Sequence, residues 1–113
     1  MTTIKQRIGI KPLSINKAWQ GRRFMTKEYK QWVKDALLLM GKQRELVGDV
    51  SVHLDFYVKY PKMCDIDNPV KTCLDLFKKR GWLKDDRQVT YLSVCKKQSE
   101  QERIEVEIKE LDK

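Results

Sequence analysis

Two pairs of aspartates and a lysine stand close together in the middle of this 113-residue chain, and their types suit the hydrolysis of phosphate esters. Asp65 and Asp67 are separated by one residue, and Asp85 and Asp86 follow further on. Carboxylates packed together repel one another unless a cation neutralises them, and a hard divalent ion prefers oxygen ligands. Such an ion polarises phosphate oxygens and activates water. We therefore predict a site for Mg²⁺, in which Mn²⁺ would substitute.

The elements around these acids are expected to bring them together. Asp65 and Asp67 follow an apolar strand pattern, and residues two apart in an extended chain point to the same face. One helix and one turn would then return Asp86 to their side. Lys71 lies about one helical turn after Asp67, so its ammonium group would reach the same cluster and stabilise negative charge added to phosphorus. The sequence thus predicts three acids and one lysine in a single site.

A helix is predicted directly after the first acidic pair. Pro69 suits a first helical turn, with Asp67 or Asn68 as the N-cap, because proline lacks a backbone donor that a helix start leaves unpaired. Gly81 is a natural end for this helix. Its buried face is expected to carry Val70, Cys73, Leu74 and Phe77.

Taken together, these residues resemble the RusA family of Holliday junction resolvases. The similarity is densest over residues 60–96 and includes Asp-x-Asp-Asn at 65–68 and Asp-Asp-x-Gln-Val at 85–89. Further matching positions are Pro12, Ser14, Asn16, Lys71 and Asp75. The resemblance implies a metal-binding triad of Asp65, Asp67 and Asp86, with Lys71 as the active-site lysine.

The resemblance also implies a reaction and a set of partners. The expected enzyme is a Mg²⁺-dependent endodeoxyribonuclease that resolves four-way junction DNA by paired symmetric nicks, with a metal-activated water attacking the phosphodiester. A symmetric homodimer would present two equivalent sites to two equivalent phosphates. Neither a covalent intermediate nor a small-molecule cofactor is expected.

Two other functions stay open at this stage. Aspartates favour turns and helix caps, so Asp67 and Asp85 could serve the backbone alone in a non-catalytic, basic DNA-binding module. Capping explains one acid per turn and does not account for the whole set. A metal-dependent nuclease acting on RNA or ordinary duplex would share the same site and differ only in substrate.

The distribution of charge favours a polyanionic partner. The net charge is +8, and residues 1–63 hold 13 Lys and Arg against 5 Asp and Glu, whereas residues 64–113 hold 11 of each. Such an excess suits phosphate binding, although a solvated basic surface would look the same. Candidate DNA-binding residues are Lys17, Arg22 and Arg23, which are interleaved with aromatic residues, and Lys27 on the polar face of the first predicted helix.

Composition indicates a cytoplasmic protein, in a bacterial or phage-infected cell if the resemblance holds. No apolar run approaches the roughly 20 residues of a membrane span, and residues 1–11 lack the features of a signal peptide. Three cysteines without a C-x-x-C motif indicate reduced thiols. With His53 as the single histidine, a structural zinc site is not expected, and we predict a solvated or hydrogen-bonded imidazole.

The expected fold is a single α+β domain over residues 1–113, with a mixed sheet of about four strands and two main helices in the order β-α-β-α-β-β. The predicted strands cover about 3–11, 50–60, 87–97 and 103–109, and the helices follow Thr26 and Asp67. The segment 13–25 is expected to be a loop.

Two features of the predicted strands and helices concern packing partners. Strand 87–97 has two partly apolar faces, so we expect it to be central or covered, and we expect the last strand to pair with it as a hairpin. Leu38 and Leu39 widen the apolar stripe of the first helix, which suggests a partner subunit there.

Overall fold

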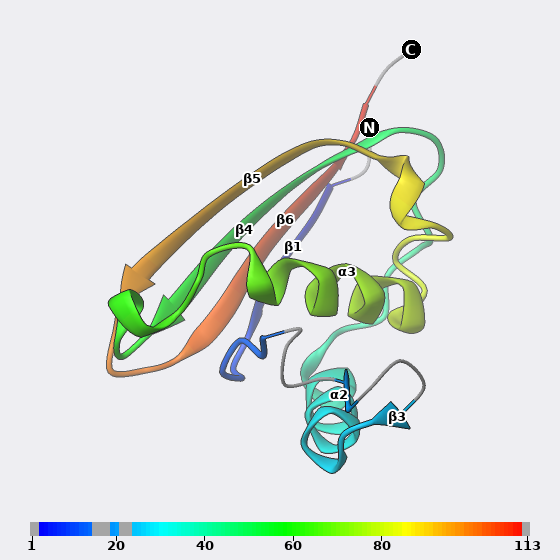
Figure 1. Ribbon diagram of the computed structural model, residues 1–113. Coiled ribbons are helices and arrows are strands. Elements are labelled where there is room, and N and C mark those ends of the chain that lie inside the picture. The colour runs from blue at the N-terminus through cyan, green and yellow to red at the C-terminus, as the bar shows by residue number, and fades with distance from the viewer. Residues whose placement is uncertain (1–2, 15–18, 21–23, 112–113) are drawn as a thin grey trace.

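The computed structural model describes the backbone of residues 3–14, 19–20 and 24–111, and the side chains of 3–14 and 26–111. A four-stranded sheet and two helices follow one another in the predicted order β-α-β-α-β-β, as Figure 1 shows. The α+β class with a mixed sheet is therefore confirmed.

The sheet combines antiparallel and parallel pairs. Its strands are β1 (Thr3–Ile8), β4 (Val50–Val58), β5 (Val89–Gln98) and β6 (Arg103–Glu110). Their spatial order is β1-β6-β4-β5. Strand β6 is antiparallel to both β1 and β4, whereas β4 and β5 are parallel and are connected through a helix.

The predicted hairpin between the last two strands is wrong. Strand β6 lies between β1 and β4, and the short connection 99–102 crosses the end of β4. This crossing is fixed by hydrogen bonds from Ser99 N to Val58 O (3.0 Å) and from Lys59 N to Glu102 Oε2 (3.2 Å). The alternating pattern that identifies a strand defines its buried face and not its neighbours, so proximity in sequence misled the pairing.

Strand β5 is an edge strand, which corrects the expectation of a central position. Its outer edge has no pairing strand among the described residues, and the side chains of Tyr91 and Leu92 are 69% and 47% exposed. The two partly apolar faces of this strand are therefore not explained by burial within one chain.

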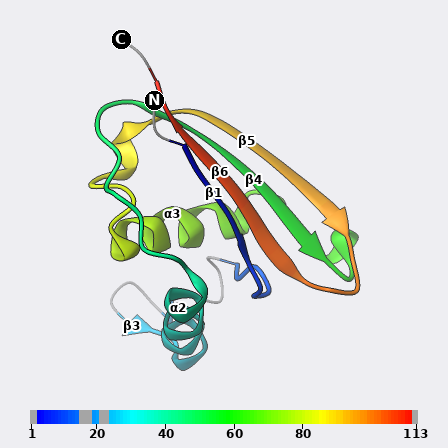
Figure 2. The same ribbon diagram turned by 180° about the vertical axis from the view of Figure 1, so that it is seen from behind.

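The two helices cover one face of the sheet, as Figure 2 shows from behind. Helix α2 (Lys27–Leu39) begins at the N-cap Thr26, whose hydroxyl accepts a hydrogen bond from Tyr29 N (3.1 Å). Helix α3 (Asn68–Arg80) ends at Gly81, which adopts a φ of 85° that other residues rarely reach. No helix of the described chain is long and apolar enough to span a bilayer.

The core lies between this helical layer and the sheet. Strand β4 alternates strictly between buried and half-buried positions, and β6 does so over most of its length, because side chains of successive strand residues point to opposite faces. Trp82 is completely buried and stacks on Phe77 with ring centroids 5.5 Å apart. Its indole donates a hydrogen bond to Gly41 O (3.0 Å), which connects the end of α3 to the chain after α2.

Two expected bounds differ locally. The segment expected to be a loop over residues 13–25 contains two short antiparallel strands, β2 (Trp19–Gln20) and β3 (Phe24–Met25), which are too short to leave a period in the sequence. Strand β1 ends at Ile8 because Ile10 N turns back to Ile8 O at 2.8 Å.

Candidate active site

The first acidic pair lies in a turn rather than at the end of a strand. Strand β4 ends at Val58, a short 3-10 turn (Pro61–Met63) follows, and Asp67 has helical dihedral angles (φ −83°, ψ −24°). The argument from strand alternation for Asp65 and Asp67 is therefore wrong. Both side chains are exposed, and the turn that carries them is closed by a hydrogen bond from Asn68 N to Asp65 O (3.3 Å).

The side chains of this pair are not used for capping α3. Asp67 occupies the N-cap position but makes no side-chain hydrogen bond to the helix start. Asp65 accepts a hydrogen bond from the amide of Asn68 at 3.3 Å. Because an N-cap aspartate normally bonds a backbone N–H of the first turn, capping does not explain the carboxylate of Asp67.

The loop before Asp65 is held from the edge strand. Nζ of Lys96 donates to the carbonyl oxygens of Pro61 and Cys64, both at 2.7 Å. The same period of two that places Val94 on the inner face of β5 also places Lys96 there, opposite Phe56. The sequence interpretation did not identify this contact, although a lysine at an inward-facing strand position is a signal for it.

The second acidic pair divides its roles. Asp85 caps a 3-10 turn (Asp86–Gln88) by accepting from Arg87 N at 3.0 Å. The capping interpretation therefore holds for Asp85. Asp86, the first residue of the turn, is the member of the pair that contacts α3, through Lys71.

Gln88 fixes this turn in the fold and was not identified from the sequence. Its Oε1 accepts from Lys84 N (2.9 Å) and Asp85 N (3.1 Å). Its Nε2 donates to Leu46 O (3.0 Å) and Gly48 O (2.9 Å), in the segment that leads into β4. The position of Asp86 thus depends on a side chain that joins two distant segments.

Lys71 connects α3 to the second acidic pair. Its Nζ lies 2.9 Å from Asp86 Oδ2 and 3.1 Å from Asp75 Oδ1. The hydrogen bond from Lys71 holds the pKa of the Asp86 carboxyl below its usual range, and the same bond raises the pKa of Lys71. The side chains of Lys71 and Asp86 are 52% and 27% exposed, so solvent limits the net stabilisation of this pair to about 0–1 kcal/mol.

The three predicted ligands are not brought to one point. Among the described residues, the donor atoms of Asp65, Asp67 and Asp86 do not form a group within 4.8 Å of one another. Asp86 is instead paired with Lys71, about one turn along the helix that starts directly after Asp67. Every donor in this set is a carboxylate oxygen, which is the donor type that a hard cation prefers.

Pro12 and Ser14, which belong to the N-terminal part of the RusA-like pattern, lie beside the turn that carries Asp65 and Asp67. A cavity of about 650 Å³ is lined by residues that include Pro12, Ser14, Asp65 and Asn68. The hydroxyl of Thr72, on α3, lies 2.7 Å from Leu13 O, so the segment 12–14 is tied to the helix that follows the acids. The fold thereby joins sequence motifs that are more than 50 residues apart.

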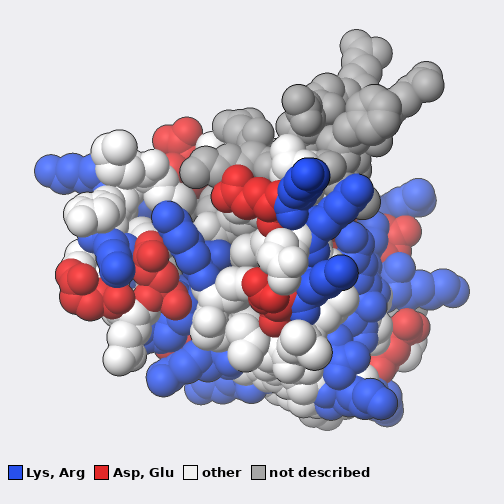
Figure 3. All heavy atoms as spheres, turned by 90° about the horizontal axis from the view of Figure 1, so that it is seen from below, with Lys and Arg blue, Asp and Glu red and all other residues white. Residues whose placement is uncertain are grey.

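Of the four predicted DNA-binding residues, the structure describes Lys27. Lys27 is the first residue of α2 and is exposed, whereas Lys17, Arg22 and Arg23 lie outside the described residues. Figure 3 shows Lys and Arg side chains over much of the face seen from below, with acidic groups between them.

The site thus combines exposed aspartates before α3 with a lysine of α3 that pairs with Asp86. Comparison with protein families gives a match to Endodeoxyribonuclease RusA over residues 13–109. The chain belongs to this family of Holliday junction resolving endodeoxyribonucleases, which are typically metal-dependent. A search of curated proteins gives no match.

Family membership confirms the resemblance noted from the motifs and identifies the protein as a phosphodiester hydrolase acting on DNA. It favours the nuclease over a non-catalytic binding module. The individual site residues, the identity of the metal ion and the oligomeric state remain predictions.

Proposed function

We propose that this protein resolves four-way DNA junctions in a Mg²⁺-dependent reaction, with Asp65, Asp67 and Asp86 as metal ligands and Lys71 as a catalytic residue. The contact of 2.9 Å between Lys71 Nζ and Asp86 Oδ2 carries the proposal. It joins the helix that follows the first acidic pair to the turn that carries the second, so residues 15 positions apart meet at one place.

A bound divalent ion would activate water and polarise the scissile phosphate. The ion pair indicates what the side chains would do. Asp86 would exchange Lys71 for the metal, because one carboxylate oxygen does not serve both cations fully. The released ammonium group of Lys71 would then stabilise the charge that develops on the phosphate oxygens. Asp75, at 3.1 Å from Nζ, would keep Lys71 within reach of the site.

The basic residues would position the junction. Phosphate contacts from Lys and Arg supply affinity that is independent of sequence. Lys27, together with Lys17, Arg22 and Arg23, belongs to the N-terminal half that carries the whole charge excess. We therefore propose that these four residues contact the arms of the junction.

We also propose that two copies pair through the edge of β5. An edge strand of 10 residues offers a row of backbone donors and acceptors to another strand. Tyr91 and Leu92 stand exposed there, and a two-fold partner would cover both. This arrangement would account for the two partly apolar faces of β5, and it would present two equivalent sites to a two-fold junction.

Asp86→Asn tests the site. The variant should lose Mg²⁺-dependent cleavage of a labelled four-way junction while it still binds the junction, because it keeps the shape of the side chain and removes the charge. Asp49→Asn, at an exposed acid before β4, is the matched control and should cleave as the unmodified protein does. Cleavage by Asp86→Asn at the wild-type rate would refute the assignment.

Competition among unlabelled junction, linear duplex and RNA would identify the preferred substrate. The proposal requires the junction to compete best, and a better competitor among the other two would contradict it.

Sedimentation of Leu92→Asp should show a monomer if β5 forms the dimer. Loss of the dimer in Leu38→Asp and not in Leu92→Asp would place the interface on α2 instead.

A further inference from the structure

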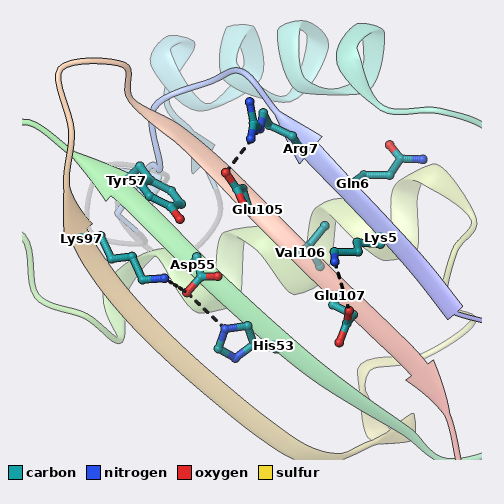
Figure 4. A pocket seen from close by; sticks show the side chains of 10 residues that line it. All are labelled: Lys5, Gln6, Arg7, His53, Asp55, Tyr57, Lys97, Glu105, Val106 and Glu107. Atoms are coloured by element: carbon teal, nitrogen blue, oxygen red, sulfur yellow. Dashed lines mark hydrogen bonds and ion pairs between the residues drawn. The ribbon is translucent and has the colours of Figure 1, made fainter.

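The face of the sheet opposite the helices carries a group of side chains unlike those of the acidic site. Donor atoms of His53, Asp55 and Cys95 all lie within 4.8 Å of one another. Figure 4 shows the imidazole of His53 and the carboxylate of Asp55 on this open face, with the helices behind the sheet. We propose that the three residues form a second metal site, selective for a borderline transition ion such as Zn²⁺.

The parallel pairing of β4 and β5 creates this group. His53 lies opposite Ser93 and Asp55 lies opposite Cys95 in the register of the two strands. Neighbouring strands are only about 4.8 Å apart, and residues two apart share a face. The spacing in the sequence gives no zinc pattern, because the cysteine comes from a different strand than the other two ligands.

A hydrogen bond between Nδ1 and Ser93 orients the ring of His53. Its Nδ1 lies 2.6 Å from Ser93 Oγ, and its Nε2 lies 3.1 Å from Asp55 Oδ1. A hydroxyl both donates and accepts, so Ser93 is able to bond either tautomer. In the tautomer that carries its proton on Nδ1 and donates it to Ser93 Oγ, Nε2 has a lone pair that would bind a metal in place of its contact with Asp55, which is the arrangement usual for ligating histidines.

The donor set decides the class of metal. One imidazole nitrogen, one carboxylate oxygen and one thiolate sulphur suit Zn²⁺, which takes three protein ligands and leaves a fourth position open to water. Mg²⁺ takes oxygen ligands and would not select the thiolate. Cys95 is exposed and not in a disulfide, so its thiol is accessible to an ion in solution. The two predicted metal sites therefore differ in chemistry and lie on different parts of the fold.

Lys97 competes with the metal for Asp55. Its Nζ lies 3.4 Å from Asp55 Oδ1, as the dashed line in Figure 4 shows. Removing this ammonium group would free the carboxylate and reduce the positive charge next to the site. Lys97→Gln should consequently bind Zn²⁺ more tightly than the unmodified protein, an effect opposite to that of losing a ligand.

Co²⁺ is the probe, because a cobalt–thiolate bond gives an intense charge-transfer absorption. Titration of the reduced full-length protein without Mg²⁺ should give this absorption at one equivalent, and Zn²⁺ should displace it. Cys95→Ser should abolish it, His53→Gln should weaken binding strongly, and Ser93→Ala should weaken it about 10- to 100-fold. Cys64→Ser, at a half-buried thiol in the loop before Asp65, is the control and should titrate as the unmodified protein does.

Several outcomes would overturn the site: no thiolate absorption, an absorption that survives Cys95→Ser, or one that Cys64→Ser removes. Unchanged melting of metal-free Cys95→Ser would show that the fold is intact. The same titration in Asp86→Asn separates the two proposals, because Co²⁺ should still give the thiolate absorption in a protein that does not cleave junctions.

Discussion

The side chain of Lys96 donates a hydrogen bond of 2.7 Å to the carbonyl oxygen of Cys64, the residue directly before Asp65. A second bond of the same length reaches Pro61 O, so a side chain of the edge strand β5 holds the loop that carries the first acidic pair. Because both bonds go to backbone oxygens of the loop, we predict that Lys96 positions the first acidic pair and does not itself contact phosphate.

Lys96→Met should therefore impair cleavage more than folding. Methionine keeps the aliphatic length and loses both hydrogen bonds, so the turn with Asp65 would shift. A displacement of about 1 Å in such a site is enough to lower the rate up to about 100-fold. Single-turnover cleavage at saturating Mg²⁺ measures the effect, and Lys62→Met, at an exposed lysine of the same loop, is the control. Equal rates for the two variants would show that the two hydrogen bonds of Lys96 do not affect cleavage.

Lys71→Met should separate metal binding from catalysis. Loss of the ammonium group frees Asp86 and Asp75, so Mg²⁺ should bind more tightly while cleavage at saturating Mg²⁺ is lost. Calorimetric titration and junction cleavage measure the two effects. Lys79→Met, at an exposed lysine of the same helix, should alter neither strongly. Weaker Mg²⁺ binding in Lys71→Met would contradict the proposed exchange of cations at Asp86.

Gln88→Ala should lower the free energy of unfolding by about 1–3 kcal/mol, because backbone groups that its amide now pairs would be left without partners. Four such bonds of 2.9–3.1 Å join the turn of Asp86 to the segment before β4. Urea denaturation compares it with Gln98→Ala, whose side-chain amide donates to the exposed Glu100 at 3.3 Å. A change as small as that of Gln98→Ala would mean that the turn is held by other contacts.

The ion pair of Lys71 and Asp86 gives stability a defined pH dependence. The pKa of Asp86 is lowered in the folded state, so its contribution is present at neutral pH and is lost as the pH falls through that lowered pKa. The pKa of Lys71 is raised, so its contribution is lost as the pH rises through the raised value. The difference in unfolding free energy between the unmodified protein and Asp86→Asn should stay within about 1 kcal/mol. It should shrink toward acid, and a constant difference would contradict the pairing.

Local patterns predicted the elements well. The N-cap Thr26, the end of α3 at Gly81 and the strict alternation of β4 each depend on contacts within one or two turns or on one strand, so each leaves a mark in the sequence. Where the pattern misplaced the first acidic pair, the cause was also local. Asp65 and Asp67 follow a 3-10 segment of three residues, which is too short to leave a period that separates it from the strand before it.

The sequence by itself determined the residue types of the candidate site, the helix bounds and the family, because these depend on short-range order along the chain. Only the tertiary structure decided that β6 inserts between β1 and β4, that Lys96 and Gln88 hold the two acidic turns, and that His53 meets Cys95. These contacts join residues more than 30 positions apart, and their partners are chosen by the packing of the whole sheet against its helices.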